Sequence, residues 1–255
     1  MAPKPVANPL ELTPQEFNSF IKFRRFLARE LKAMGIKTKL DIDVVQDPIK
    51  WKKKLRKYEW ALDAYNTGKL ENGGGVNKPT VRKPGKQAIK YVVGVLPSKK
   101  RDVIQTLFHE AAHAAAFELM RKHGLILIKF NKQTVPYIAS EARTGAEALA
   151  MSLEMERYSD KPSLQNAVLK EYTKICSKSP VFEEHRLGLK LAKAILAVAP
   201  YSLADRRLLR EKTAEFIVSH KASLLGISNF ADQLEAKKGK SMLKALRKRA
   251  AVKAS

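Results

Sequence analysis

The segment that most constrains the fold is an alanine-rich helix that carries two histidines and a glutamate. Residues 102–122 have the spacing of a helix that ends at Gly124 and contains His109-Glu110-Ala111-Ala112-His113. Large apolar residues flank this run, and five small alanines lie within and directly after it, which is typical of a buried helix that passes close to a neighbour. Buried polar groups need partners, because leaving one unpaired costs about 1–3 kcal/mol. The chain of 255 residues must therefore build a core with a polar site inside it.

The spacing of the two histidines predicts a metal site. His109 and His113 are four residues apart, so both imidazoles lie on one face of the helix and can reach the same cation. Glu110 stands beside them, where it can reach a metal-bound water instead of the metal. Neutral imidazoles with a carboxylate and one open position suit Zn²⁺, which is the cofactor we expect. The alternative is a pair of surface histidines with an incidental glutamate.

The remaining chain predicts an α+β, mostly helical fold. Two β-branched runs, 88–96 and 125–130, are predicted strands on either side of the histidine helix. A capping box at Thr13–Glu16 starts a predicted N-terminal helix. Further helices are predicted over residues 47–68, 138–157, 162–178, 181–199, 202–219 and 229–249. We divide the chain into a basic helical N-terminal region (1–75), a core with a helical C-terminal subdomain (76–236) and a basic tail (237–255).

The segment of about 55 residues around His109-Glu110-Ala-Ala-His113 resembles the zincin superfamily of metallopeptidases. Metzincins carry a third histidine six residues after the second, but Leu119 stands there, so that branch is disfavoured. Gluzincins take a glutamate from a following helix, often in a Glu-Gly-Phe/Leu-Ala run, and Glu147-Ala148-Leu149-Ala150 is similar. The resemblance implies a zincin-like core with a small sheet packed beside the HExxH helix. The residue pattern of the rest of the chain adds a basic helical N-terminal region and a helical C-terminal half.

The same resemblance implies site residues and a reaction. Zn²⁺ held by His109, His113 and Glu147 would activate a water molecule, and Glu110 would take its proton and pass it to the leaving amine. Glu141 and Glu154 compete with Glu147 as the third metal ligand. Glu154 could instead contact one of the metal-binding side chains without touching the metal, and Glu147 could be an ordinary surface glutamate. We prefer Tyr158 as the oxyanion donor, because it shares a helical face with Glu147. The other candidates for that role are Tyr137, Tyr201, His185 and His220.

The formal net charge of +24 is concentrated at the two ends of the chain. Residues 1–107 carry net +13 and residues 237–255 carry net +8, whereas 108–236 carry only +3. Such ends predict a polyanionic partner, above all nucleic acid, although a basic surface can also serve solubility alone. The tail was expected to become helical only on binding. The predicted nucleic-acid contacts are Lys52, Lys53, Lys54, Arg56, Lys57, Lys237, Lys238, Lys240, Lys244, Arg247, Lys248 and Arg249.

Two functions follow as hypotheses. The first is a zinc-dependent, gluzincin-like metallopeptidase that acts on a protein or peptide near nucleic acid. The second is a nucleic-acid-associated structural or packaging protein, of virion or nucleoid type, that uses the zincin-like scaffold. A single cysteine, Cys176, excludes an internal disulfide framework, and no apolar run is long enough for a membrane span. We therefore expect an intracellular protein that is not secreted.

Overall fold

The computed structural model assigns helices and strands along most of the chain. It describes residues 13–36, 41–45, 75–83, 86–95, 100–125, 127–130, 133–136, 140–158, 161–177, 183–200, 202–219, 223–235 and 237–254. The helices are α1 (Pro14–Ala33), α4 (Lys100–Lys122), α5 (Ser140–Glu154), η1 (Met155–Tyr158, a 3₁₀ helix), α6 (Pro162–Cys176), α7 (Glu183–Val198), α8 (Leu203–Val218), α9 (Leu224–Glu235) and α10 (Lys237–Ala254). The predicted helix over 47–68 lies outside the described residues.

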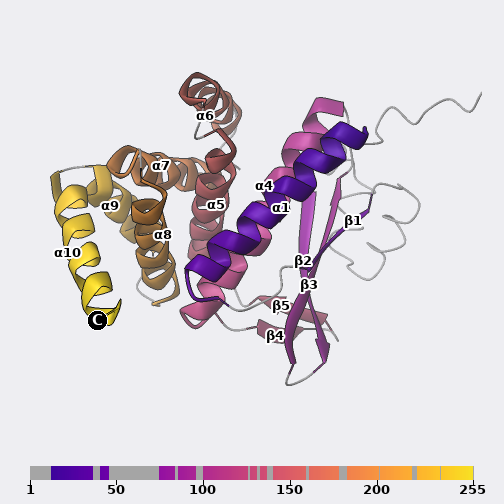
Figure 1. Cartoon of the computed structure of the whole chain (residues 1–255), viewed down its shortest axis with the longest axis horizontal. Helices are drawn as coiled ribbons and strands as arrows, with labels where there is room; N and C mark the ends of the chain where they lie inside the picture. The colour runs from indigo at the N-terminus through magenta and orange to yellow at the C-terminus, as the bar shows by residue number, and fades with distance from the viewer. Residues whose placement is uncertain are drawn as a thin grey trace, which may run out of the picture.

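In the described backbone, five strands of 4 to 10 residues form two separate sheets. They are β1 (Asp41–Val45), β2 (Gly75–Lys83), β3 (Lys86–Val95), β4 (Leu127–Phe130) and β5 (Gln133–Pro136). The central β3 pairs in parallel with β1 and antiparallel with β2, and β4 pairs antiparallel with β5. Figure 1 shows the strands on the side of α4 that is remote from α7–α10. The side chains of the strands lie outside the described part of the structure.

The described hydrophobic core is formed by helices and by a few residues that directly follow them. One cluster joins α1, α4, α5 and α8, and in it the aromatic rings of Phe20 and Phe23 contact that of Phe108 with centroids 5.8 and 5.1 Å apart. A second cluster joins one face of α5 to α7, α8, α9 and α10. Helices α5 and α8 therefore belong to both clusters and connect the two halves of the helical body (Figure 1).

The predicted fold class is wrong. A zincin-like α+β core requires a sheet that packs its side chains against the HExxH helix, but the part of the chain with described side chains is helical and contains no strand. There, α1, α5 and α8 cover α4. The physical reason lies in α4 itself, where Ala111, Ala112 and residues 114–116 are fully buried and allow neighbouring helices to approach closely. The described core is therefore helix packed on helix.

The C-terminal region also differs from the expectation. A single helix was predicted over 229–249, but α9 ends at Glu235 and α10 begins at Lys237. Gly239 explains the tight junction, because a Cβ atom there would lie 2.0 Å from the carbonyl oxygen of Leu234. The tail is helical without a bound partner. Leu243 of α10 is buried against α7–α9 in the second cluster. Across the described ranges, no helix combines the length and hydrophobicity needed to cross a bilayer.

Candidate metal centre

Helix α4 supplies two imidazoles to one point. His109 and His113 lie one turn apart, and their Nε2 atoms are 3.0 Å from each other. Their side chains are only 15% and 10% exposed, because the alanines on either side leave no gap between α4 and its neighbours. The Nδ1 atom of His113 is buried and finds no hydrogen-bond partner among the residues described. The backbone of one buried helix thus positions both rings.

Helix α5 brings a carboxylate to the same point. Glu147 Oε2 lies 3.2 Å from His109 Nε2, and its Oε1 lies 3.3 Å from His113 Nε2. The ligand atoms of the three residues all lie within 4.8 Å of one another. A tetrahedral metal with ligand bonds of about 2.0–2.1 Å places its ligand atoms about 3.3 Å apart. The donor set and its spacing therefore fit a metal ion such as Zn²⁺.

Glu154 lies behind His109 and not beside Glu147. Its Oε2 is 3.2 Å from His109 Nδ1, on the opposite side of the ring from the cluster, and the carboxylate is completely buried. The hydroxyl of Tyr172 in α6 donates a hydrogen bond of 2.8 Å to the same oxygen. A carboxylate on the second nitrogen of a ligand histidine fixes its tautomer and orientation. Glu154 and Tyr172 thus hold His109 with Nε2 directed at Glu147 and His113.

The charges in the metal-free cluster compensate one another. Burial alone would lower the pKa of His109, but hydrogen bonds and charges from Glu147 and Glu154 outweigh burial and raise this pKa well above its usual value. Burial alone would raise the pKa of Glu147, but the charge of His113 and the hydrogen bonds from both histidines hold it well below its usual value. In this cluster, protonated imidazole therefore forms ion pairs with the carboxylates, and a bound cation would have to replace these protons.

Glu110 is the buried carboxylate next to the cluster. Its residue is 8% exposed. Burial raises the pKa of Glu110, and the charges of His113 and His109 offset only part of that effect. A carboxylate whose pKa is raised toward neutrality is suited to accept a proton and to return it. Glu110 thus differs from Glu147, whose pKa is lowered, and the two carboxylates are suited to different tasks.

Among the predicted oxyanion donors, His185 lies at the site and Tyr158 lies in a different environment. His185 of α7 has Nε2 3.6 Å from Glu147 Oε1, and its side chain is 39% exposed, so it stands at the open side of the cluster. Tyr158 instead packs on the hydrophobic group of Met155, Val168 and Leu196. Tyr137, Tyr201, His220 and the side chain of Glu141 lie outside the described part.

Tyr172 is the site residue that sequence reasoning missed. It lies on α6, 63 positions after His109, in a stretch of mixed polarity with no motif. Its ring centroid is 6.1 Å from that of His109, and its hydroxyl reaches Glu154. The sequence feature that could have indicated Tyr172 was the presence of a tyrosine in the predicted helix after the one that carries Glu147. That signal does not distinguish it from Tyr158.

The predicted nucleic-acid contacts fall into two groups. Residues 52–57 lie outside the described residues. The tail residues lie on α10, where the side chain of Lys237 is not described and Arg247 forms an ion pair with Asp205. Besides Arg247, whose side chain is 59% exposed, the exposed cations in the described part of α10 are Lys238, Lys240, Lys244, Lys248 and Arg249. Helix α10, which carries them, is separated by other helices from α4, which carries His109 and His113 (Figure 1).

Comparisons with known protein families, with curated proteins and with solved structures found no match.

Proposed function

We propose that the protein is a metal-dependent hydrolase that cleaves peptide bonds by a gluzincin-like mechanism. The observation that carries the proposal is the convergence of His109 Nε2, His113 Nε2 and the Glu147 carboxylate, with separations of 3.0–3.3 Å. Three protein ligands leave one position of a tetrahedral ion open, as in catalytic zinc sites, whereas structural sites use four. A bound Zn²⁺ supplies Lewis-acid activation of water and of the scissile carbonyl group.

The surrounding side chains have roles that follow from their placement. Glu110 accepts the proton of the attacking water at its carboxylate and delivers it to the leaving amine, which its raised pKa supports. Glu154 and Tyr172 keep His109 Nδ1 protonated and its ring in place. His185, at the open side of the cluster, donates a hydrogen bond toward the carbonyl oxygen of the substrate.

The metal is tested first, by elemental analysis of protein purified without added metal. We expect about one equivalent of zinc in the wild type and less than about a tenth in His113→Ala, because metal binding needs both imidazoles. The matched control is His123→Ala, which removes a histidine that lies just beyond the end of the same helix and away from the cluster. Loss of zinc from both variants, or its absence from the wild type after zinc is added, contradicts the metal site.

The reaction is tested separately, with a peptide library and the Glu110→Gln variant. We expect this variant to keep its zinc and to lose hydrolysis by at least about a hundredfold, because it lacks a general base. Glu147→Gln is expected to lose zinc affinity instead. A wild type with full zinc content and no turnover on any peptide contradicts the hydrolase and leaves the metal centre standing.

A further inference from the structure

Helix α10 is a fixed part of the helical body. Leu243 is buried, and Met242 and Leu246 pack on the same cluster. Arg247 donates two hydrogen bonds of 2.7 and 2.5 Å to the carboxylate of Asp205 at the start of α8. One side of α10 is thereby attached to α8 and α9, and its opposite side is held toward solvent.

The solvent side of α10 carries a stripe of lysines. Lys240, Lys244 and Lys248 follow one another at intervals of four residues, so their side chains lie one above the next on the same helical face. All three are exposed, and Lys238 and Arg249, on another part of the helix surface, are exposed as well. Residues 237–254 contain no Asp or Glu. The stripe is therefore cationic along its whole length.

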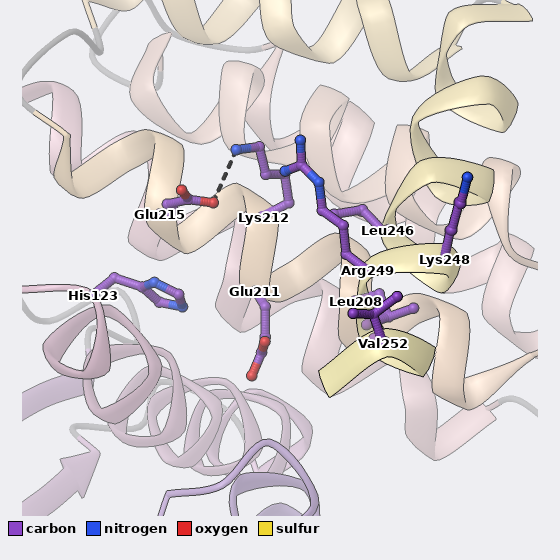
Figure 2. A pocket seen from close by; sticks show the side chains of 10 residues that line it. His123, Leu208, Glu211, Lys212, Glu215, Leu246, Lys248, Arg249 and Val252 are labelled. Atoms are coloured by element: carbon purple, nitrogen blue, oxygen red, sulfur yellow. Dashed lines mark hydrogen bonds and ion pairs between the residues drawn. The ribbon is translucent and has the colours of Figure 1, made fainter. Parts of the chain in front are cut away.

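The acidic side chains of the cavity between α8 and α10 already have cationic partners. Helices α8 and α10 border a cavity of about 710 Å³, and Glu211, Lys212, Glu215 and Lys248 are among the residues that line it. Figure 2 shows the ion pair of Glu215 with Lys212 at 2.9 Å, and Glu211 pairs with Lys122 at 2.5 Å. Asp205 is engaged by Arg247, and no ion pair among the described residues neutralises Lys240, Lys244 or Lys248.

We infer that the Lys240–Lys244–Lys248 stripe of α10 binds the phosphate backbone of double-stranded nucleic acid without regard to sequence. Lysines act on phosphates as point charges, and the packed helix holds their backbone positions before binding, which reduces the entropy lost on association. The inference does not depend on the proposed hydrolase, because none of these residues belongs to the metal cluster.

An anionic membrane is the other partner that such a stripe could attract. Interfacial helices insert apolar side chains between the headgroups. In α10 the large apolar residues Met242, Leu243 and Leu246 face the core, and Val252, 69% exposed, is the one exposed large hydrophobic residue in the described part of the helix. The stripe can therefore contact surface charge but cannot insert, which favours nucleic acid.

The test compares two triple variants of the full chain with equal change in charge. The first is Lys240→Gln/Lys244→Gln/Lys248→Gln, and the second is the matched control Lys161→Gln/Lys170→Gln/Lys174→Gln, at exposed lysines on and beside α6. Duplex DNA binding is measured by fluorescence anisotropy in a salt titration. Log K falls with log salt, and each phosphate contact contributes about 0.9 to the steepness of this fall. Loss of three contacts should therefore make the slope less steep by roughly 2.7.

We expect that reduction in the stripe variant and a wild-type slope in the control. A third variant with arginine at positions 240, 244 and 248 keeps the charge and should retain binding, which separates lost charge from lost folding. Equal slopes for the stripe variant and the wild type overturn the inference. So does an equal loss in the α6 control. Binding to phosphatidylserine vesicles without binding to the duplex also overturns it.

Discussion

Gly188 is the position where α7 lies closest to the helix that carries Glu147. It is buried, and a Cβ atom built on it would lie 2.8 Å from Glu147 Cβ, 3.1 Å from the backbone nitrogen of Ala148 and 3.1 Å from the carbonyl oxygen of Thr144. All three are backbone atoms or a Cβ atom, which cannot move independently of the helix. The change Gly188→Ala therefore has to push α7 and α5 apart at the level of the candidate metal ligand.

The size of the effect follows from these distances. Carbon atoms pack at about 3.5–4.0 Å, so relief of the 2.8 Å contact with Glu147 Cβ requires a shift of roughly 0.7 Å or more. Overpacking of this kind costs about 1–3 kcal/mol, whereas alanine gains about 1 kcal/mol over glycine in a helix interior. We expect a net loss of roughly 1 kcal/mol in the free energy of unfolding. Metal sites tolerate about 0.2 Å, so zinc affinity should fall at least about tenfold.

The assay measures thermal unfolding without metal and zinc affinity by competition with a chelator. The expected decrease in Tm for the metal-free protein is about 2–4 °C. The control is Ala167→Gly, at an exposed position inside α6, which measures the helical preference for alanine without a packing change and should leave zinc affinity unaltered. A Gly188→Ala protein that is more stable than the wild type and binds zinc equally well would refute the reasoning.

Two further predictions concern pH. Burial alone would raise the pKa of Glu156, but Arg210 and Arg206 lower it below its usual value, so its contribution to stability is present above about pH 4.5 and is lost as the pH falls through the lowered pKa. Glu156→Gln should therefore lose about 3–5 kcal/mol at pH 7, with a smaller loss in acid, as measured by urea unfolding. The pKa of His109 is raised, so its imidazole must lose a proton before a metal binds. Zinc affinity, measured by calorimetry at several pH values, should therefore rise about tenfold per pH unit until the pH exceeds that pKa. A zinc affinity that does not change with pH contradicts this prediction.

The sequence made the local part of the site predictable. The shared face of His109 and His113 follows from helical geometry within five residues. Glu147 was nominated by a resemblance to gluzincins and not by its spacing, and the reasoning from residues left Glu154 as a competitor. The structure separates the two, because the Glu147 carboxylate lies on the Nε2 side of His109 and the Glu154 carboxylate lies on its Nδ1 side. That distinction depends on how α5 is rotated against α4, which no local pattern encodes.

The larger errors have the same origin. Two β-branched runs predicted a sheet as part of the core. The sequence does not show which elements cover the alanines of α4, and in the described part of the chain these elements are helices. The tail was expected to stay disordered because eight cations within residues 237–255 repel one another. Burial of Leu243 and the Arg247–Asp205 pair, both long-range contacts, offset this repulsion and stabilise a packed helix.

Helix α8 supports both the candidate metal centre and the basic face of α10. Its buried Arg210 donates to the carbonyl and hydroxyl oxygens of Ser152 in the last turn of α5, which also carries Glu154, while Asp205 at its start holds Arg247 of α10. A substitution in this shared support therefore disturbs both functions through the fold. The lysine stripe lies on α10 and Glu110 lies on α4, and these two helices belong to different core clusters, so the effects of changes at the two places should add. Each proposed function can therefore be removed alone by changing the lysine stripe of α10 or Glu110 beside the candidate metal site. Changes at the arginines of α8 cannot separate the two functions.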